Sequence, residues 1–205
     1  MDEHANRLYL AGEWHSLPAY SHTCCGAPFW RFTVSVQRRS GVPDILPVLA
    51  EERLLPPMPA IGDPVALSGQ LRAYSQRTEA GNRLHIVAFA REMSGAPAEH
   101  DNCVSLTGVL IKPAAYRSTP LGREITDLFL SVPRAFGKSD LLPVIAWGRN
   151  ARVARLWQSG DAAAVTGRLQ SRVYVKRLPD GSEMSRLAYE VSAGTIERLS
   201  AAERA

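Results

Sequence analysis

Residues 35–50 read SVQRRSGVPDILPVLA, and residues 131–146 read SVPRAFGKSDLLPVIA. The second stretch repeats the first at a separation of 96 positions, with no insertion or deletion between them. A chance similarity would not keep one register through turn residues and apolar residues together. The chain therefore contains two copies of one structural unit. The positions that are identical in the two stretches are Ser35, Val36, Arg38, Gly41, Asp44, Leu46, Pro47, Val48 and Ala50.

The repeat extends outward from this stretch in both directions. Toward the N-terminus, Asn6, Gly12 and Gly26 match Asn102, Gly108 and Gly122 at the same separation. Toward the C-terminus the separation becomes 98, so two residues have entered one loop. The pairs there are Gly62-Asp63 with Gly160-Asp161, Gly69 with Gly167, and Leu71 with Leu169.

A short segment of small, Pro- and Gly-bearing sequence, residues 94–98, separates the two copies. Linkers have this composition, although a loop inside a single domain would also have it. We predict an N-terminal domain at residues 1–94, a linker at 95–101, a C-terminal domain at 102–198 and a short tail at 199–205.

The second copy has the pattern of a small β-barrel. Strand-like stretches cover residues 104–110, 125–132, 141–147, 163–176 and 186–191, with a turn signal at 179–181. Residues 150–158 predict a short helix that Asn150 would cap, with Val153, Leu156 and Trp157 on its apolar side. Five strands with a helix between the third and fourth follow the OB-fold plan, so the fold class is all-β with two tandem OB-fold barrels. A β-sandwich is the alternative, and it would more often omit the helix.

The positive charge of the chain lies in its second half. Residues 1–98 hold nine arginines and nine acidic residues, whereas residues 99–205 hold fifteen basic and eleven acidic residues. The net charge of +4 therefore belongs to the second copy, which is expected to attract polyanions. No stretch is apolar enough to span a membrane and no secretory signal pattern is present, so we expect a cytoplasmic, nucleoid-associated protein with reduced thiols at Cys24, Cys25 and Cys103.

The second copy also holds the residue types that bind single strands. Cations along a groove contact phosphates, and exposed aromatic faces stack on bases of any identity. A single aromatic is more often a core residue, but Phe136 lies in a polar turn and Tyr174 lies among basic residues, where core residues are uncommon. The predicted DNA-binding residues are Phe136, Trp147, Tyr174, Arg134, Arg149, Arg168, Arg172, Lys176, Arg117 and Lys112.

Several motifs in order resemble the bacterial single-stranded DNA-binding protein family. They are NCVSLTG at 102–108, RSTPLGREI at 117–125, PVIAWGRNA at 143–151, Gly160-Asp161, and GRLQSR at 167–172 followed by Tyr174. The first copy resembles the family more weakly. The resemblance implies stacking on Phe136, Trp147 and Tyr174, no cofactor, no metal and no catalysis. Leu141 stands where the family often has a further aromatic residue.

The resemblance also implies partners. Family members usually form tetramers of single OB domains, so a tandem chain would supply four domains as a homodimer. The family's acidic recruiting tail has no counterpart at residues 200–205, so replication or restart proteins would be recruited by another route, if at all.

The first copy departs from this site. Ser40 stands in place of Phe136, Glu51 in place of Trp147, and Pro56, Pro57 and Pro59 disfavour its helix. We expect this copy to serve assembly or auxiliary binding. Its own aromatic residues would otherwise form a different stacking surface: Trp14, Tyr20, Phe29, Trp30 and Tyr74.

Other functions remain as alternatives. These are a primosomal replication-restart accessory, a protein-interaction scaffold that has lost nucleic-acid binding, and an RNA-binding protein. A zinc site at His15, His22, Cys24 and Cys25 lacks the usual Cys-x-x-Cys spacing, and Glu124, Asp127 and Asp140 are too scattered to indicate a nuclease. We therefore expect a protein that is not an enzyme and that binds and protects single-stranded DNA during replication, recombination or repair.

Overall fold

The computed structural model describes residues 5–38, 40–78, 81–95, 100–119, 121–177 and 181–200. In this part of the chain, the first half forms a closed five-stranded barrel. Its strands follow the order β1 (Asn6–Trp14), β3 (Ala27–Gln37), β4 (Pro43–Glu51), β6 (Gly81–Ser94) and β5 (Pro64–Thr78), which pairs with β1 again. All of these pairs are antiparallel except β4 with β6. A further strand, β2 (Ala19–Cys24), extends the sheet beside β3.

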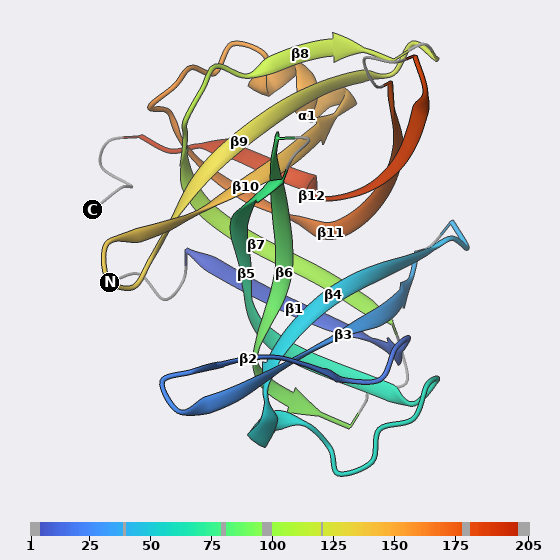
Figure 1. The fold of residues 1–205 in the computed structure, drawn as a ribbon. Coiled ribbons are helices and arrows are strands. Elements are labelled where there is room, and N and C mark those ends of the chain that lie inside the picture. The colour runs from blue at the N-terminus through green and yellow to red at the C-terminus, as the bar shows by residue number, and fades with distance from the viewer. Residues whose placement is uncertain are drawn as a thin grey trace.

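The second half builds the same barrel. The ring is β7 (Asp101–Leu110), β9 (Glu124–Arg134), β10 (Lys138–Trp147), β12 (Glu183–Arg198) and β11 (Ala162–Arg177), and β8 (Ala115–Ser118) lies beside β9 (Figure 1). Both rings have the OB-fold connectivity, and the all-β, tandem OB-fold prediction is confirmed. The additional strands β2 and β8 were not predicted, because they are short and mostly exposed, so their sequences show no alternation of apolar and polar residues.

The helix of the second barrel is shorter and earlier than predicted. α1 covers Gly148–Ala154 and follows Trp147, so the Asn150 cap is wrong; the Asn150 side chain instead donates a hydrogen bond to the Gly194 carbonyl oxygen at 2.8 Å. Trp157 is buried as predicted, but it lies beyond the helix. Val153 is exposed, because the two-turn helix buries only Ala151 and Ala154, and Leu156, which lies beyond the helix, is exposed as well. In the first barrel a 3₁₀ turn, Glu52–Leu54, replaces the helix, in line with its prolines.

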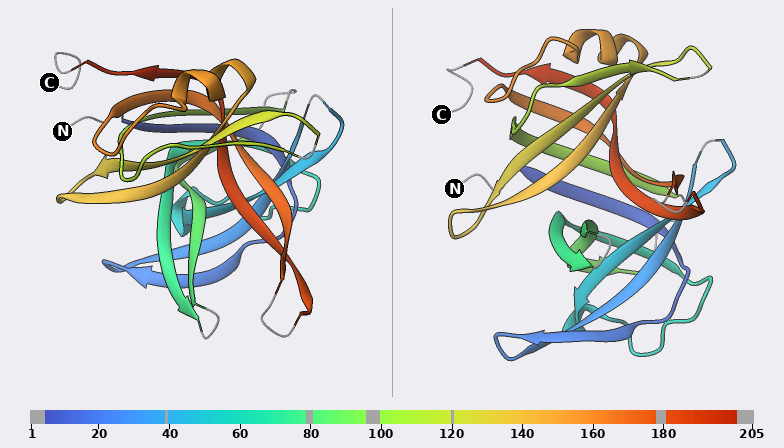
Figure 2. Two further views of the ribbon diagram at one scale, coloured as in Figure 1. Left: turned by 90° about the horizontal axis from the view of Figure 1, so that it is seen from above. Right: turned by 45° about the horizontal axis from the view of Figure 1, so that its top comes forward.

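The two barrels are joined edge to edge by β1 and β7, which pair antiparallel between them (Figures 1 and 2). Leu8 pairs with Val104, and these two residues are repeat equivalents at the separation of 96. A pseudo-twofold axis therefore passes through this pair. The hairpins of β5–β6 and β11–β12 project from the same side of the molecule (left view of Figure 2). Residues 96–99 of the predicted linker lie outside the described residues, and the domain boundaries stay a prediction.

The repeated asparagines bind equivalent backbone groups. Asn6 donates to the Leu71 carbonyl oxygen at 2.8 Å and accepts from the Leu71 amide at 2.9 Å. Asn102 makes the same two bonds to Leu169, at 2.7 and 2.9 Å. Each asparagine thus satisfies both polar groups of a residue on the neighbouring strand of its barrel, where an unpaired buried group would cost stability.

The repeated glycines mark places where strands cross closely. A Cβ atom on Gly12 would lie 2.2 Å from the Ser35 carbonyl oxygen, and one on Gly108 would lie 2.7 Å from that of Ser131. Gly69 and Gly167 are equally confined, by the carbonyl oxygens of Phe89 and Ser192. These positions lie within strands, where glycine is otherwise unfavourable, so the close approach explains their repetition.

We expect Gly12→Ala to lower the free energy of unfolding by about 2 kcal/mol or more, because backbone must move to admit the methyl group. Gly95→Ala is the matched control, since nothing lies within 4 Å of a Cβ atom there. Urea denaturation followed by circular dichroism measures both values. Equal stabilities for the two variants would contradict the argument.

Candidate nucleic-acid interface

The outer face of β8, β9 and β10 carries the first group of predicted residues, and we name it the Trp147 face. Trp147 pairs with Ile125, which pairs with Arg117, so these three side chains lie on one side of the sheet. Leu141 pairs with Ser131 and extends the same side along β10. Trp147 is 37% exposed at the surface. The Trp147 face is therefore an exposed aromatic residue beside a basic one.

The cations of the Trp147 face are held in place by neighbours. Arg117 donates to both carboxylate oxygens of Asp127, at 2.7 and 3.2 Å. This hydrogen bonding raises the pKa of Arg117 above its ordinary value, with a smaller contribution from the charge of Glu190. The Lys112 ammonium lies 5.2 Å from the ring centre of Phe129, a cation–π distance. Both cations thus lie over the sheet.

Two further predicted arginines lie around this face. Arg149 is exposed in the first turn of α1, two residues after Trp147. Arg172 of β11 lies 3.5 Å from a Glu190 carboxylate oxygen, which also accepts a hydrogen bond from Gln170. The backbone of Tyr174 and Lys176 continues β11, but their side chains lie outside the described part of the structure.

Arg134 and Phe136 lie elsewhere, which sequence reasoning did not foresee. Phe136 is at the tip of the β9–β10 turn with a positive φ of 62°, and it is 94% exposed. This turn lines a groove of about 1280 Å³ over the N-terminal barrel, together with residues of β3, β4, β5 and β6. Trp147 does not line this groove. The predicted site is therefore divided between two surfaces.

Asp140 fixes the turn against the N-terminal barrel. Its carboxylate is fully buried and accepts hydrogen bonds from the Ala73 amide and from Arg72, each at 2.9 Å. Arg134 also reaches it, at 3.4 Å. A carboxylate of the C-terminal barrel thus binds backbone and cation of the N-terminal barrel.

The repeat-equivalent carboxylate, Asp44, makes the reciprocal contact. It accepts from the Ser171 amide at 2.7 Å and from Arg38 Nε, also at 2.7 Å. Arg38 in turn donates to the Ser171 carbonyl oxygen. Ser171 and Ala73 are repeat equivalents at a separation of 98. The two barrels therefore hold each other through a pair of pseudo-symmetric carboxylate contacts.

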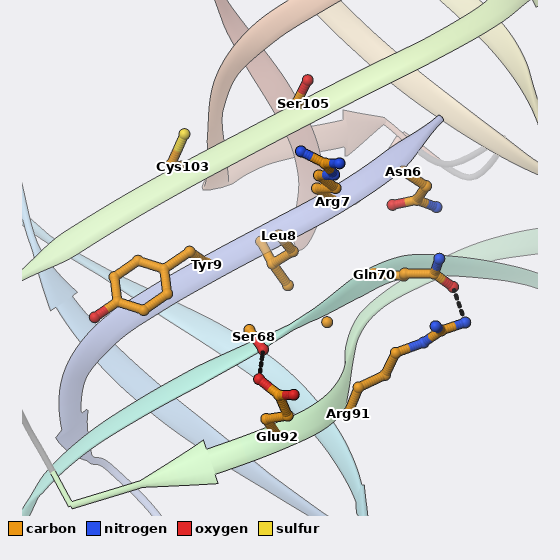
Figure 3. Close-up of a pocket in the computed structure, with 11 residues that line it drawn as sticks. Asn6, Arg7, Leu8, Tyr9, Ser68, Gln70, Arg91, Glu92, Cys103 and Ser105 are labelled. Carbon is orange, nitrogen blue, oxygen red and sulfur yellow. Dashed lines mark hydrogen bonds between the residues drawn. The ribbon is translucent and has the colours of Figure 1, made fainter. Parts of the chain in front are cut away.

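The outer surface of β1 and β7 forms a third region, which we name the central face. Arg7 and Tyr9 of β1 and Cys103 and Ser105 of β7 lie side by side on it (Figure 3). The hydrogen bonds of Ser68 with Glu92 and of Arg91 with Gln70 border the same surface. The repeat register places Arg168 at the position of Gln70, so this predicted DNA-binding residue belongs to the central face.

Sequence reasoning predicted only part of the aromatic surface over the N-terminal barrel. Tyr74 and His85 are opposite each other on β5 and β6, and their rings stack at 5.0 Å with an interplanar angle of 9°. Phe89 stacks more loosely on Phe29 at 5.8 Å and lies under the Arg72 guanidinium at 5.5 Å. Tyr74 and Phe29 belong to the alternative stacking surface predicted for the first copy, whereas His85 and Phe89 were not predicted. The pairing across two strands, which no sequence pattern marks, is what brings these rings together.

The cysteine and histidine cluster near residue 24 shows no metal geometry. The free Sγ atoms of Cys24 and Cys25 are 3.8 Å apart, and the His22 ring stacks on Phe29 at 5.3 Å. Over the described residues, no group of three His, Cys, Asp or Glu side chains is placed to bind a metal ion. Nor is any helix among them both long and apolar enough to cross a membrane.

Comparison with known proteins gives a consistent picture. Residues 101–199 match the Single-strand binding protein family. The wild-type single-stranded DNA binding protein of Thermus aquaticus aligns with a TM-score of 0.77 at 22% identity, covering 95% of this chain and 93% of that one. A deletion mutant of that protein aligns with a TM-score of 0.76, again at 22% identity, covering 95% and 94%. These alignments establish the tandem fold.

A smaller structure also aligns. The dimeric N-terminal domain of PriB protein from Thermoanaerobacter tencongensis is 32% identical over 45% of this chain and 97% of that one, with a TM-score of 0.39. The comparison with curated protein sequences gave no match.

We expect Asp140→Ala to lower the free energy of unfolding by about 3–5 kcal/mol, because it leaves Arg72 and Arg134 without their buried partner. Asp127→Ala, which removes the exposed partner of Arg117, is the control and is expected to cost under about 1 kcal/mol. Thermal and urea unfolding measure both. A small effect of Asp140→Ala would mean that the turn is held by other contacts.

Proposed function

We propose that this protein binds and protects single-stranded DNA without marked sequence preference, because residues 101–199 match the Single-strand binding protein family. It would act as a binding protein and not as an enzyme, in DNA replication, recombination or repair.

The Trp147 face is the observation that carries the proposal. It combines an exposed indole with the cations of Lys112, Arg117 and Arg149 on neighbouring elements. A base stacked on an aromatic ring contributes about 1–3 kcal/mol whatever its identity, and cations around it meet the phosphates. Arg117 already donates to both carboxylate oxygens of Asp127, so these donor groups are engaged and are not offered to a base edge. Binding would therefore tolerate any sequence.

Replacing Trp147 and Tyr174 together by alanine is expected to weaken binding to oligo-dT by roughly 10-fold or more, since one to two stacked bases would be lost. Fluorescence titration with a labelled oligonucleotide measures the affinity. Log affinity is expected to fall against log salt with a slope of about −0.7 per phosphate neutralised.

Tyr20→Ala is the control for this titration, because Tyr20 is an exposed tyrosine of the N-terminal barrel that lies neither on the Trp147 face nor among the residues that line the groove. If the folded Trp147/Tyr174 double variant bound oligo-dT with the affinity of the wild type, stacking of bases on these two side chains would be refuted. If the wild type bound no strand at all, an interaction scaffold would be favoured. Equal binding to RNA would favour an RNA-binding protein. Specific capture of a restart protein would favour the accessory role.

We further propose that the protein is a homodimer that supplies four OB domains. The central face is the candidate contact, because it presents Tyr9 beside both a basic and an acidic side chain, Arg91 and Glu92. In an isologous interface such a surface faces its own copy, so unlike charges can meet across the axis.

A Tyr9→Glu variant is expected to sediment as a monomer of 22.4 kDa, while the wild type sediments at twice this mass. The introduced carboxylate would be buried without a partner at the interface. Tyr20→Glu serves as the charge-matched control and should remain dimeric. A wild type that sediments as a monomer at micromolar concentration would rule out the dimer.

A further inference from the structure

The turn between β2 and β3 carries two adjacent cysteines whose role is still open. Cys24 ends β2 and pairs with Ala27, the first residue of β3, so Cys25 and Gly26 form a two-residue turn. Both turn residues have a positive φ, 53° at Cys25 and 81° at Gly26, as in a type I′ turn. Asparagine, aspartate or glycine usually occupies the first of these positions. A cysteine there is unfavourable for the backbone, so the turn does not explain its side chain.

Packing does not explain the pair either. The side chains of Cys24 and Cys25 are both exposed, and both thiols are free. The equivalent turn of the second copy, residues 120–122, reads PLG, in the register that matches Gly26 with Gly122. The adjacent thiols are therefore a feature of the first copy alone.

The spacing of the two sulfur atoms suits a shared ligand better than a bond between them. Their Sγ atoms are 3.8 Å apart, whereas a disulfide bond is about 2.05 Å long. Adjacent residues also have Cα atoms only about 3.8 Å apart, below the roughly 4.4 Å at which disulfides usually begin. Two sulfurs bound at about 2.3 Å to one tetrahedral centre, the length of a zinc–thiolate bond, would be about 3.8 Å apart. The pair is thus spaced to bind one thiophilic atom with both sulfurs.

The electrostatics of the pair favour such a ligand. The Cys24 thiol donates a hydrogen bond to Cys25 Sγ, and this bond, with a smaller contribution from the charge of Cys25, raises the pKa of Cys24 above its ordinary value. Two neighbouring thiolates oppose each other in this way. A centre that binds both sulfurs covalently removes the opposition, because it replaces both thiol protons.

Two sulfurs are the ligands that the chain supplies at this place. Among the residues that the structure describes, no third His, Cys, Asp or Glu is placed to complete a metal site with them, and the His22 ring stacks on Phe29. A structural zinc ion takes four ligands. Trivalent arsenic that carries one organic group takes only two further ligands, because the organic group occupies its third bond. Such an arsenical therefore fits the ligand set.

We propose that Cys24 and Cys25 form a chelating dithiol site for trivalent arsenic compounds that carry one organic group. Each of the two arsenic–hydroxyl bonds of the hydrated compound is replaced by an arsenic–sulfur bond, one to each Sγ atom. Each thiol proton leaves with the displaced hydroxide as water. Arsenic stays trivalent, so the reaction needs no oxidant and no reductant. The site is independent of the binding of single strands, and a single exposed thiol such as Cys103 does not provide it.

The test titrates the full-length protein with phenylarsine oxide, after reduction with a phosphine that is then removed. Native mass spectrometry is expected to show one phenylarsenic group bound per chain, with the loss of two protons. An excess of the monothiol 2-mercaptoethanol should leave the group bound, because the linked thiols act at a high effective concentration. The small dithiol 2,3-dimercaptopropanol should remove it, since it chelates arsenic in the same way.

Cys24→Ser and Cys25→Ser are each expected to weaken retention of the arsenical by about 10²- to 10⁴-fold, because the second bond is no longer intramolecular. Cys103→Ser is the matched control, since it also removes one exposed thiol but leaves the pair. It is expected to retain the arsenical as the wild type does. Circular dichroism verifies that each variant is folded.

Two results would overturn the proposal. One is equal retention of the arsenical by the wild type and by the folded Cys24→Ser variant, and the other is a loss of retention in Cys103→Ser alone. Peptide mapping of the loaded wild type needs no variant. The arsenical is expected on the peptide that contains residues 24 and 25, and its location on the peptide of Cys103 would contradict the site. None of these results bears on the binding of oligo-dT, which the fluorescence titration tests separately.

Discussion

The antiparallel pairing of β1 with β7 is the constraint on which the rest of the structure depends. It sets Leu8 against its own repeat equivalent, Val104, and thereby places the two barrels about a pseudo-twofold axis. Every other contact between the barrels follows from this placement. The carboxylates of Asp44 and Asp140 reach equivalent strands in opposite barrels because the axis relates them. Two domains in one chain thus acquire the arrangement of an isologous dimer.

Fusion in one chain allows the two halves to diverge, which a homodimer of single domains could not do. The reciprocal carboxylate contacts are kept in both copies, whereas the residues around them differ. Phe136 on the second-copy turn is Ser40 on the first, and Tyr74 on the first hairpin is Arg172 on the second. The groove that contains Phe136 therefore has no full counterpart on the other side of the axis. The two copies have therefore diverged in their exposed residues, whereas the carboxylates that make the reciprocal contacts about the pseudo-twofold axis are the same in both.

The sequence predicted the architecture because the repeat preserves residues with strict structural roles. Gly12 and Gly108 are retained where strands approach too closely for a Cβ atom, and Asn6 and Asn102 where a residue of the neighbouring strand needs both its polar groups satisfied. The helix was misplaced because Asn150 resembles a cap locally, while its side chain is engaged by Gly194, far along the chain. The local capping preference of asparagine was therefore overridden by a tertiary hydrogen bond that the local sequence does not reveal.

The site was harder to predict than the fold, for the same reason. Residue types predicted that Trp147, Arg117 and Lys112 would be available, and these residues of three different segments do share a face. Sequence order could not say that the β9–β10 turn crosses to the other barrel, because that depends on Asp140 binding Ala73 and Arg72. Binding residues of a tandem protein are therefore best assigned to surfaces and not to domains. Phe136, for example, is part of the C-terminal barrel in the sequence, but its side chain lines the groove over the N-terminal barrel.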